Sequence, residues 1–256
     1  MNSIRFGCTA LTGVNKVGNL KQDDNGYYSM VVGALNVFNS AGQYYVYEKS
    51  REMFEESSQL MRRVARGALR GEYGHPKPQI GQSDEQFARR VMTIDEDKIC
   101  CHHKELVLDF ERIKDEQGRP IIAIISKVYP SGPLGHVLDR QLKNKDENVC
   151  FSIRSFTRDF MDRGVTKRVL QTVVTFDYVN EPGIAAANKY MSPALESRGD
   201  DIIIKRGTLE RAVNEAQQNN GIGNESVVLT ASELFNNMGW TTQEGSNIAV
   251  PAWSKW

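Results

Sequence analysis

The feature that most constrains the fold is a long alternating segment, residues 165–179. A strand places successive side chains on opposite faces, and β-branched and aromatic residues fill most of this segment. The alternation puts Leu170, Thr172, Val174 and Phe176 on one face and Val169, Gln171, Val173, Thr175 and Asp177 on the other. We therefore expect a long strand here, with a sheet for it to pair into.

Shorter segments supply the rest of that sheet and the helices around it. Strands are predicted at 28–38, 43–47, 97–112, 119–129 and 148–156, the third and fourth forming a hairpin. Capping signals and helical spacing predict helices from about Ser50, from Ser83 to Met92 and after Ser131. These elements predict an α+β body, residues 1–190, that holds the functional site.

The C-terminal part of the sequence has a different character. Residues 188–207 mix proline, glycine and charged residues, and two predicted helices follow at 208–218 and 230–238. A Thr230…Glu233 capping box begins the second helix, and Gly239 ends it. We expect residues 191–256 to form a mainly helical extension.

Composition excludes several classes of protein. The chain has 256 residues, of which 40% are hydrophobic, and its 32 Lys and Arg balance its 32 Asp and Glu. Zero net charge argues against binding nucleic acid or an anionic membrane through a general basic field. The apolar run Ile121–Ile125 is far below the ~20 residues that a membrane span needs. The N-terminus lacks the apolar core of a secretion signal, and four cysteines form no disulfide framework, so we expect a soluble intracellular protein.

The common cofactor motifs are missing from the sequence. It contains no glycine-rich phosphate loop, dinucleotide fingerprint or His-Glu-x-x-His helix. The run Cys100-Cys-His-His103 resembles a zinc site, but adjacent strand residues point to opposite faces and zinc ligands are usually spaced across a turn. We expect neither a metal nor a cofactor.

Three segments supply the residue types of a nucleophilic triad. Glu72-Tyr-Gly-His75-Pro76 holds a histidine beside a fixed non-helical backbone, and Cys150-Phe-Ser152-Ile-Arg154 places a hydroxyl on a strand. Thr175-Phe-Asp177 places a carboxylate near the end of the long strand, with Glu181 as a competitor for the acidic role. A base, a nucleophile and an orienting acid are therefore present. Taken singly, each also fits an ordinary role as a loop, packed or turn residue.

These segments, in this order, resemble the prohead maturation proteases of large tailed bacteriophages. The resemblance covers residues 28–190 and includes the strand that ends in Lys127-Val-Tyr-Pro-Ser-Gly-Pro133. It implies a herpesvirus-assemblin-like fold, which is a compact β-barrel wrapped by helices. It also implies a serine endopeptidase that cuts phage scaffold, core and major capsid proteins, commonly after Glu, inside the prohead in the host cytoplasm. No nucleic acid, membrane or cofactor is implied, and no oligomeric state is indicated.

Carried onto this sequence, the resemblance implies catalytic roles for His75, Ser152 and Asp177. His75 is expected to take the proton from Ser152, Asp177 to orient the imidazole, and backbone N–H groups, helped by Arg154, to stabilise the oxyanion. Relatives often have glycine where Ser155 follows the arginine. Because assemblins use a second histidine, His136 is the main rival of Asp177.

The resemblance further implies self-processing after a glutamate. Two segments of the extension fit, Ala194-Leu195-Glu196 and Gly223-Asn224-Glu225, both expected in connections between elements. The alternative reading of the whole chain is a non-catalytic scaffold or capsid-core protein that keeps the protease fold.

Overall fold

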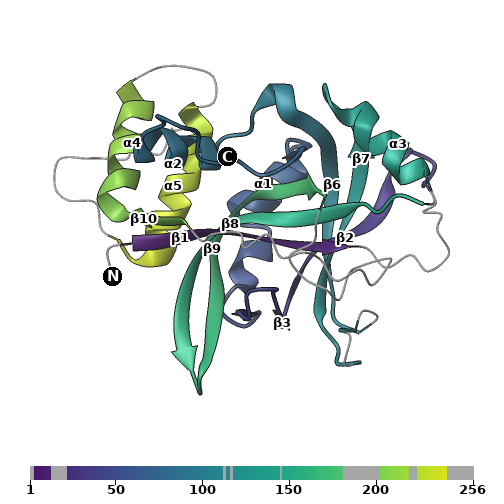
Figure 1. Cartoon of the computed structure of the whole chain (residues 1–256), viewed down its shortest axis with the longest axis horizontal. Coiled ribbons are helices and arrows are strands. Elements are labelled where there is room, and N and C mark those ends of the chain that lie inside the picture. The colour runs from purple at the N-terminus through teal and green to yellow at the C-terminus, as the bar shows by residue number, and fades with distance from the viewer. Residues whose placement is uncertain are drawn as a thin grey trace.

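The computed structural model describes residues 3–12, 22–111, 114–115, 118–144, 146–180, 202–218 and 224–240 (Figure 1). Its larger sheet, sheet A, has the strand order β10-β1-β8-β9-β4-β3. The bounds of its strands are β1 (Ser3–Thr12), β3 (Val37–Phe38), β4 (Tyr44–Tyr45), β8 (Cys150–Asp162), β9 (Val165–Val179) and β10 (Ile202–Lys205). The predicted long strand is β9, and it pairs antiparallel with β8.

The smaller sheet, sheet B, has the strand order β2-β7-β6-β5. Its strands are β2 (Tyr28–Leu35), β5 (Arg70–Glu72), β6 (Ile99–Asp109) and β7 (Ile122–Pro130). The antiparallel pairing of β6 with β7 confirms the hairpin predicted from residues 97–129.

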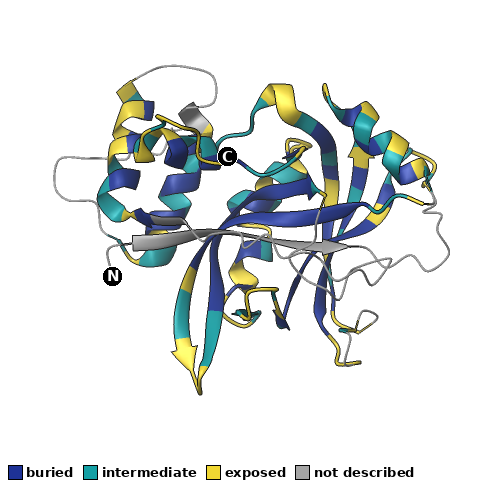
Figure 2. Cartoon of the chain, in the orientation of Figure 1, coloured by how far each residue is buried: buried dark blue, intermediate teal, exposed yellow. Residues whose placement is uncertain are grey.

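The main hydrophobic core contains residues from both sheets. Phe151 and Ile153 of β8 and Phe176 of β9 belong to one buried cluster with Val32 of β2 and Ile124 of β7. Figure 2 shows β8 and β9 dark blue through their shared central part and yellow only toward the hairpin tip. Both faces of these two strands are therefore covered where they pass through the molecule.

The helices are α1 (Gln59–Ala65), α2 (Asp84–Met92), α3 (Gly135–Lys143), α4 (Arg206–Gln218) and α5 (Asn224–Met238), with short 3-10 helices at Arg51–Phe54 and Glu96–Lys98. The predicted capping box at the start of α2 is confirmed, because Ser83 and Gln86 bond reciprocally. The expected helix from Ser50 is only one 3-10 turn. The α-helix begins later, where the Ser58 hydroxyl accepts the Met61 N–H at 3.1 Å.

The C-terminal elements pack onto the α+β body. β10 pairs with β1 at the edge of sheet A, and α4 and α5 share a second buried cluster with α2, Phe156 and Val174. Figure 1 shows α2, α4 and α5 together at one end of the molecule and α3 at the other. The expectation that α5 begins at Thr230 is wrong, because the helix starts at Asn224. Glu233 instead accepts hydrogen bonds from Thr172 of β9 and from the Gln59 N–H.

Two bulges interrupt the predicted alternation of β9. The register skips Val174 between Thr175 and Val173, and skips Gln171 between Thr172 and Leu170. Each extra residue shifts the side-chain parity by one. As a result Val173 joins Phe176 in the core between the sheets, whereas Val174 packs with the helices.

The expected closed β-barrel is wrong for the described strands. They form two sheets that approach each other where β5 meets β9, through a bridge between Tyr73 and Tyr178. The α+β class stands, but the helices lie against two open sheets. Within the described residues, none of the helices is long and apolar enough to cross a membrane.

Candidate active site

Ser152 and Asp177 face each other across the β8–β9 ladder. They are direct partners in its register, and directly opposed residues of an antiparallel pair carry side chains on the same face, with Cβ atoms about 5 Å apart. Both residues are almost completely buried. Two residues whose positions differ by 25 in the sequence (177 − 152) are thus neighbours because one hairpin pairs them.

Two glycines allow the histidine segment to reach β9. A Cβ on Gly71 would lie 2.3 Å from the Phe176 carbonyl oxygen, so only glycine permits this approach of β5. Gly74 has a φ of +81°, in the left-handed region that glycine favours, and its N–H donates to the Tyr178 carbonyl at 2.7 Å. The chain then delivers His75 to the end of β9.

The imidazole of His75 contacts Asp177 directly. The distance from His75 Nδ1 to Asp177 Oδ2 is 2.8 Å. An ionised carboxylate can only accept, so Nδ1 carries a proton, and in the neutral imidazole Nε2 then has the free lone pair. His75 Nε2 is buried, and no residue of the described chain bonds to it. This tautomer is the one that a general base on a serine requires.

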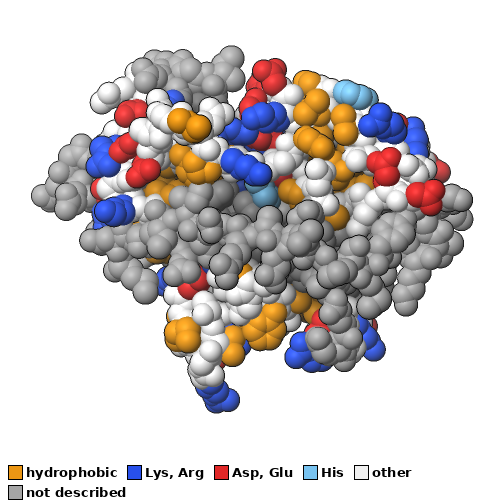
Figure 3. All heavy atoms as spheres, in the orientation of Figure 1, with side chains coloured by type: hydrophobic (Ala, Val, Ile, Leu, Met, Phe, Trp, Pro, Cys, Tyr) orange, Lys and Arg blue, Asp and Glu red, His pale blue; other side chains and the backbone are white. Residues whose placement is uncertain are grey.

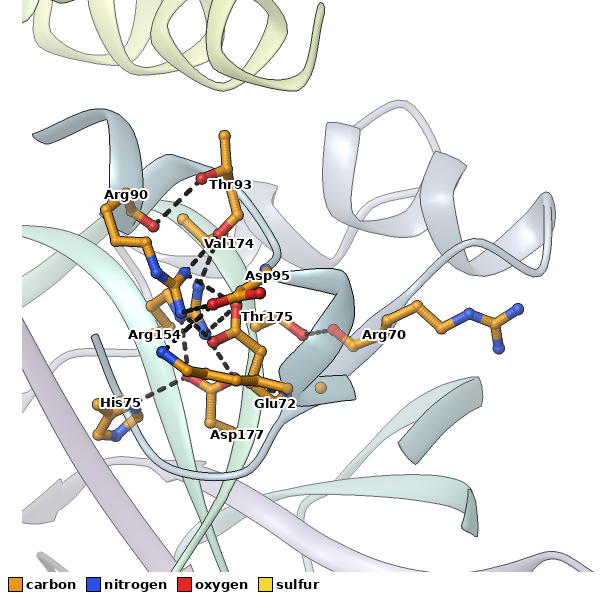
Figure 4. A network of polar contacts seen from close by, with 12 residues as sticks. Arg70, Glu72, His75, Arg90, Thr93, Asp95, Arg154, Val174, Thr175 and Asp177 are labelled. Carbon is orange, nitrogen blue, oxygen red and sulfur yellow. Dashed lines mark hydrogen bonds and ion pairs between the residues drawn. The ribbon is translucent and has the colours of Figure 1, made fainter. Parts of the chain in front are cut away.

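Asp177 accepts four hydrogen bonds, as Figure 4 illustrates for the side chains. Oδ2 accepts from His75 and from Arg154 Nε at 2.8 Å, while Oδ1 accepts from Arg154 Nη2 at 2.8 Å and from the Glu72 N–H at 3.0 Å. Burial alone would raise the pKa of Asp177, but the Arg154 guanidinium and His75 lower it to about 2. The carboxylate is therefore ionised throughout the ordinary pH range.

Arg154 is the centre of a buried charge network. Its side chain is fully buried, and it contacts Glu72 Oε1 at 3.0 Å and the Thr93 carbonyl at 2.9 Å in addition to Asp177. Arg90 of α2 in turn binds both oxygens of Glu72. Burial opposes the charge of Arg154, yet the two carboxylates raise its pKa. Sequence reasoning missed Glu72 and Arg90, although Glu72 stands in the same short motif as His75.

A sequence model of the Peptidase S80 family matches residues 6–234. The chain belongs to the Peptidase S80 family. This membership confirms the resemblance to phage maturation proteases. The capsid maturation protease of Pseudomonas phage phiKZ is 36% identical over 245 residues, which cover 93% of this chain and 89% of that protein. The solved bacteriophage T4 capsid assembly protease aligns with a TM-score of 0.47 and 11% identity, over 70% of this chain and 99% of that one.

The other candidates of the S80 chain lie apart from this contact. His136 is exposed on α3, where its Nδ1 donates to the Pro133 carbonyl at 3.1 Å. Glu181 lies outside the described residues. The group in contact with the His75 ring is Asp177, so the geometry favours Asp177 as the orienting acid.

The cysteine–histidine run forms part of the core of the S80 chain. His103 is fully buried between Ser126 Oγ at 3.0 Å and the Phe176 carbonyl at 3.0 Å, and Cys101 Sγ lies 3.4 Å from its Nε2. Among the described residues, no group of three or more His, Cys, Asp or Glu side chains is arranged to hold a metal ion.

Proposed function

We propose that this chain is a serine endopeptidase that cleaves scaffold, core and capsid proteins inside the assembling phage prohead, within the host cytoplasm. Membership of a peptidase family supports the hydrolytic activity. The phiKZ relative is a capsid maturation protease, which supports the setting and the class of substrate.

The contact between His75 and Asp177, directly beside Ser152, is the observation that carries this proposal. In the proposed mechanism Ser152 Oγ attacks the scissile carbonyl, and His75 Nε2 accepts the hydroxyl proton and later gives it to the leaving amine. Asp177 keeps the other proton on Nδ1 and stabilises the imidazolium that forms.

The oxyanion donors in this proposal are backbone N–H groups near Ser152. The sequence-based expectation that Arg154 assists them is not retained. All three guanidinium nitrogens of Arg154 face protein acceptors, and the side chain has no exposure to solvent. An arginine held in this way is not free to bind a developing charge on the substrate.

Cleavage after Glu and self-processing remain part of the proposal, with Glu196 as the preferred site. Glu196 lies outside the described residues. Glu225 lies in the first turn of α5 and not in the expected connection, and a helical backbone must unwind before it can enter a protease cleft in extended form. The helix therefore disfavours Glu225.

The test is to incubate the enzyme with its cognate scaffold and capsid proteins and to map the fragments by mass spectrometry. Wild type is expected to release fragments that end in Glu, whereas Ser152→Ala loses activity on the order of 10⁴-fold or more. Ser155→Ala is the matched control, because Ser155 is an equally buried serine on the same strand. Cleavage by Ser152→Ala would overturn the assignment, and a wild type that cuts nothing would favour the non-catalytic scaffold.

A further inference from the structure

We infer that Arg154 is a positioning residue for the proposed reaction: its two-pronged contact holds the Asp177 carboxylate in the orientation that fixes the tautomer of His75. Glu72 completes the arrangement by holding Arg154, and Arg90 holds Glu72. This inference rests on the proposed serine protease function and adds a residue group that the triad itself does not include.

The planar guanidinium of Arg154 makes a bidentate contact with the Asp177 carboxylate. Arg154 Nε and Nη2 each lie 2.8 Å from a different oxygen of Asp177. Two parallel hydrogen bonds fix the plane of the carboxylate as well as its position. That plane decides which oxygen faces the His75 Nδ1–H, and Oδ2 is shared between Arg154 and His75.

Arg154 is itself held by groups from two other parts of the fold. Glu72 at the end of β5 and the Thr93 carbonyl after α2 accept from it. Arg90 binds both oxygens of Glu72, and the Asp95 N–H donates to Glu72 Oε1 at 2.8 Å. Figure 4 shows these side chains converging from different elements around Arg154.

The network is balanced in charge. Arg154 and Arg90 carry two positive charges, Glu72 and Asp177 carry two negative charges, and the Asp95 carboxylate beside Arg90 is paired with Lys98. An unpaired buried carboxylate is costly and tends to take up a proton. A protonated Asp177 accepts poorly from His75, so without Arg154 the imidazole loses the group that selects its tautomer.

Other titratable groups also face Asp177 and enter any pH measurement. Besides Arg154 they are His75 from the loop after β5, Glu72 from β5, and Cys100, Cys101 and His103 from β6, while Arg90 and Asp95 lie one contact further out, on Glu72. All remain unchanged when Arg154 alone is replaced. A shift in the pH dependence of activity then reports the loss of the Arg154 charge.

A second arginine–aspartate pair on the same two strands, with a buried arginine and a partly exposed aspartate, provides the control. Arg168 of β9 is 1% exposed, and its Nε and Nη2 bind the two oxygens of Asp159 of β8 at 3.0 and 3.1 Å. This pair lies toward the hairpin tip, away from Ser152 in the β8–β9 register. Replacing Arg168 therefore shows how the loss of an arginine–aspartate pair on these strands affects the fold, without a change near Ser152.

The experiment compares the pH profiles of kcat/KM for wild type, Arg154→Met, Arg154→Lys and Arg168→Met on one peptide substrate, per folded molecule. Removing the Arg154 charge makes the His75–Asp177 pair bind a proton more readily. Arg154→Met is expected to move the acid limb upward by about 1 pH unit or more and to lower the optimum rate about 100-fold. Arg154→Lys keeps the positive charge but cannot form the two parallel hydrogen bonds to Asp177. Its acid limb is expected to return most of the way to the wild-type position, whereas its rate is expected to stay low. Arg168→Met is expected to keep the wild-type profile.

The tautomer of His75 gives a readout that does not depend on turnover. In ¹⁵N-histidine-labelled Ser152→Ala protein, His75 is expected as the Nδ1–H form, and with Arg154→Lys added it is expected to become a mixture. If Arg154→Met keeps the wild-type acid limb, or if Arg154→Lys keeps a single tautomer of His75, Arg154 is merely structural and the inference is overturned. Failure of the proposed function itself appears differently, as activity that survives Ser152→Ala.

Discussion

Asp177 keeps its charge without solvent because each of its oxygens accepts two hydrogen bonds. This saturation separates its role from that of a general base, since a carboxylate whose pKa is about 2 takes up no proton during turnover. In the proposed mechanism it therefore only orients and stabilises the imidazole.

Replacing Asp177 with Asn should therefore lower turnover on the order of 10³- to 10⁴-fold, because the amide presents a donor where His75 needs an acceptor. Ser152 should still be labelled, slowly, by a serine-directed reagent. His136→Ala is the comparison, with near-normal peptide cleavage expected from its exposed position. A silent Asp177→Asn together with an inactive His136→Ala would make the third member a histidine.

The depressed pKa of Asp177 also predicts how stability depends on pH. The value is about 2 in the fold against 3.8 for the free side chain, so the stability it contributes is complete above about pH 4 and is lost as pH falls toward 2. In the Ser152→Ala background, unfolding by urea should show this loss, about 2 kcal/mol. Adding Asp177→Asn should remove this part of the pH dependence of the free energy of unfolding. Asp23 and Glu85, whose pKa values are also lowered, contribute equally in both proteins. An equal pH dependence of the free energy of unfolding in the two proteins would show that Asp177 is not the buried, ionised carboxylate that the structure indicates.

At this scale the sequence indicated His75, Ser152 and Asp177, since each lies in a short motif. It did not reveal the charge network around Arg154, in which Glu72 contacts Arg154 and Arg90 contacts Glu72. Arg90 and Glu72 are 18 positions apart and lie on different elements, and their contact depends on how α2 packs against β5.

At the scale of elements, the bulges of β9 explain why two helices carry polar side chains toward it. A bulge leaves ladder carbonyls unpaired. Arg63 of α1 donates to the carbonyls of Val173 and Val174 at 2.8 and 2.5 Å, and Asn237 of α5 donates to that of Gln171. Periodicity predicted the strand but not the bulges, because these depend on register with β8.

Arg63→Met should lower the free energy of unfolding by about 2–3 kcal/mol, since it leaves two buried carbonyls without their charged donor. Arg62→Met on the same helix, at an exposed position, should stay within about 0.5 kcal/mol of wild type. Urea titration in the Ser152→Ala background measures both. Equal effects would show that the bulge carbonyls do not need Arg63.

At the scale of the whole molecule, the C-terminal elements share a core with the protease body. Ile204 of β10 and the inner faces of α4 and α5 are buried against α2, Phe156 and Val174. The composition change near residue 190 predicted an extension. It did not predict that a strand of this extension, β10, pairs with β1 at the edge of sheet A. Strand order is a long-range property, and the expected barrel was wrong for the same reason.

If the enzyme cuts itself after Glu196, the C-terminal fragment should remain bound. Wild type that has processed itself should separate into two chains under denaturing conditions yet elute as one species in native size exclusion, because the β1–β10 ladder and the shared core persist. Separation of the fragments under native conditions would contradict this packing. Glu196→Gln is the control, expected to stay in one piece.

In the proposed mechanism Ser152 is a nucleophile activated by His75. A fluorophosphonate reagent tests it most directly, with the adduct located by peptide mass spectrometry and its rate of formation measured in wild type and His75→Ala. We predict a single adduct on Ser152 that forms on the order of 10³-fold more slowly in His75→Ala. An adduct on Ser155 or elsewhere, or equal rates in the two proteins, would contradict the account.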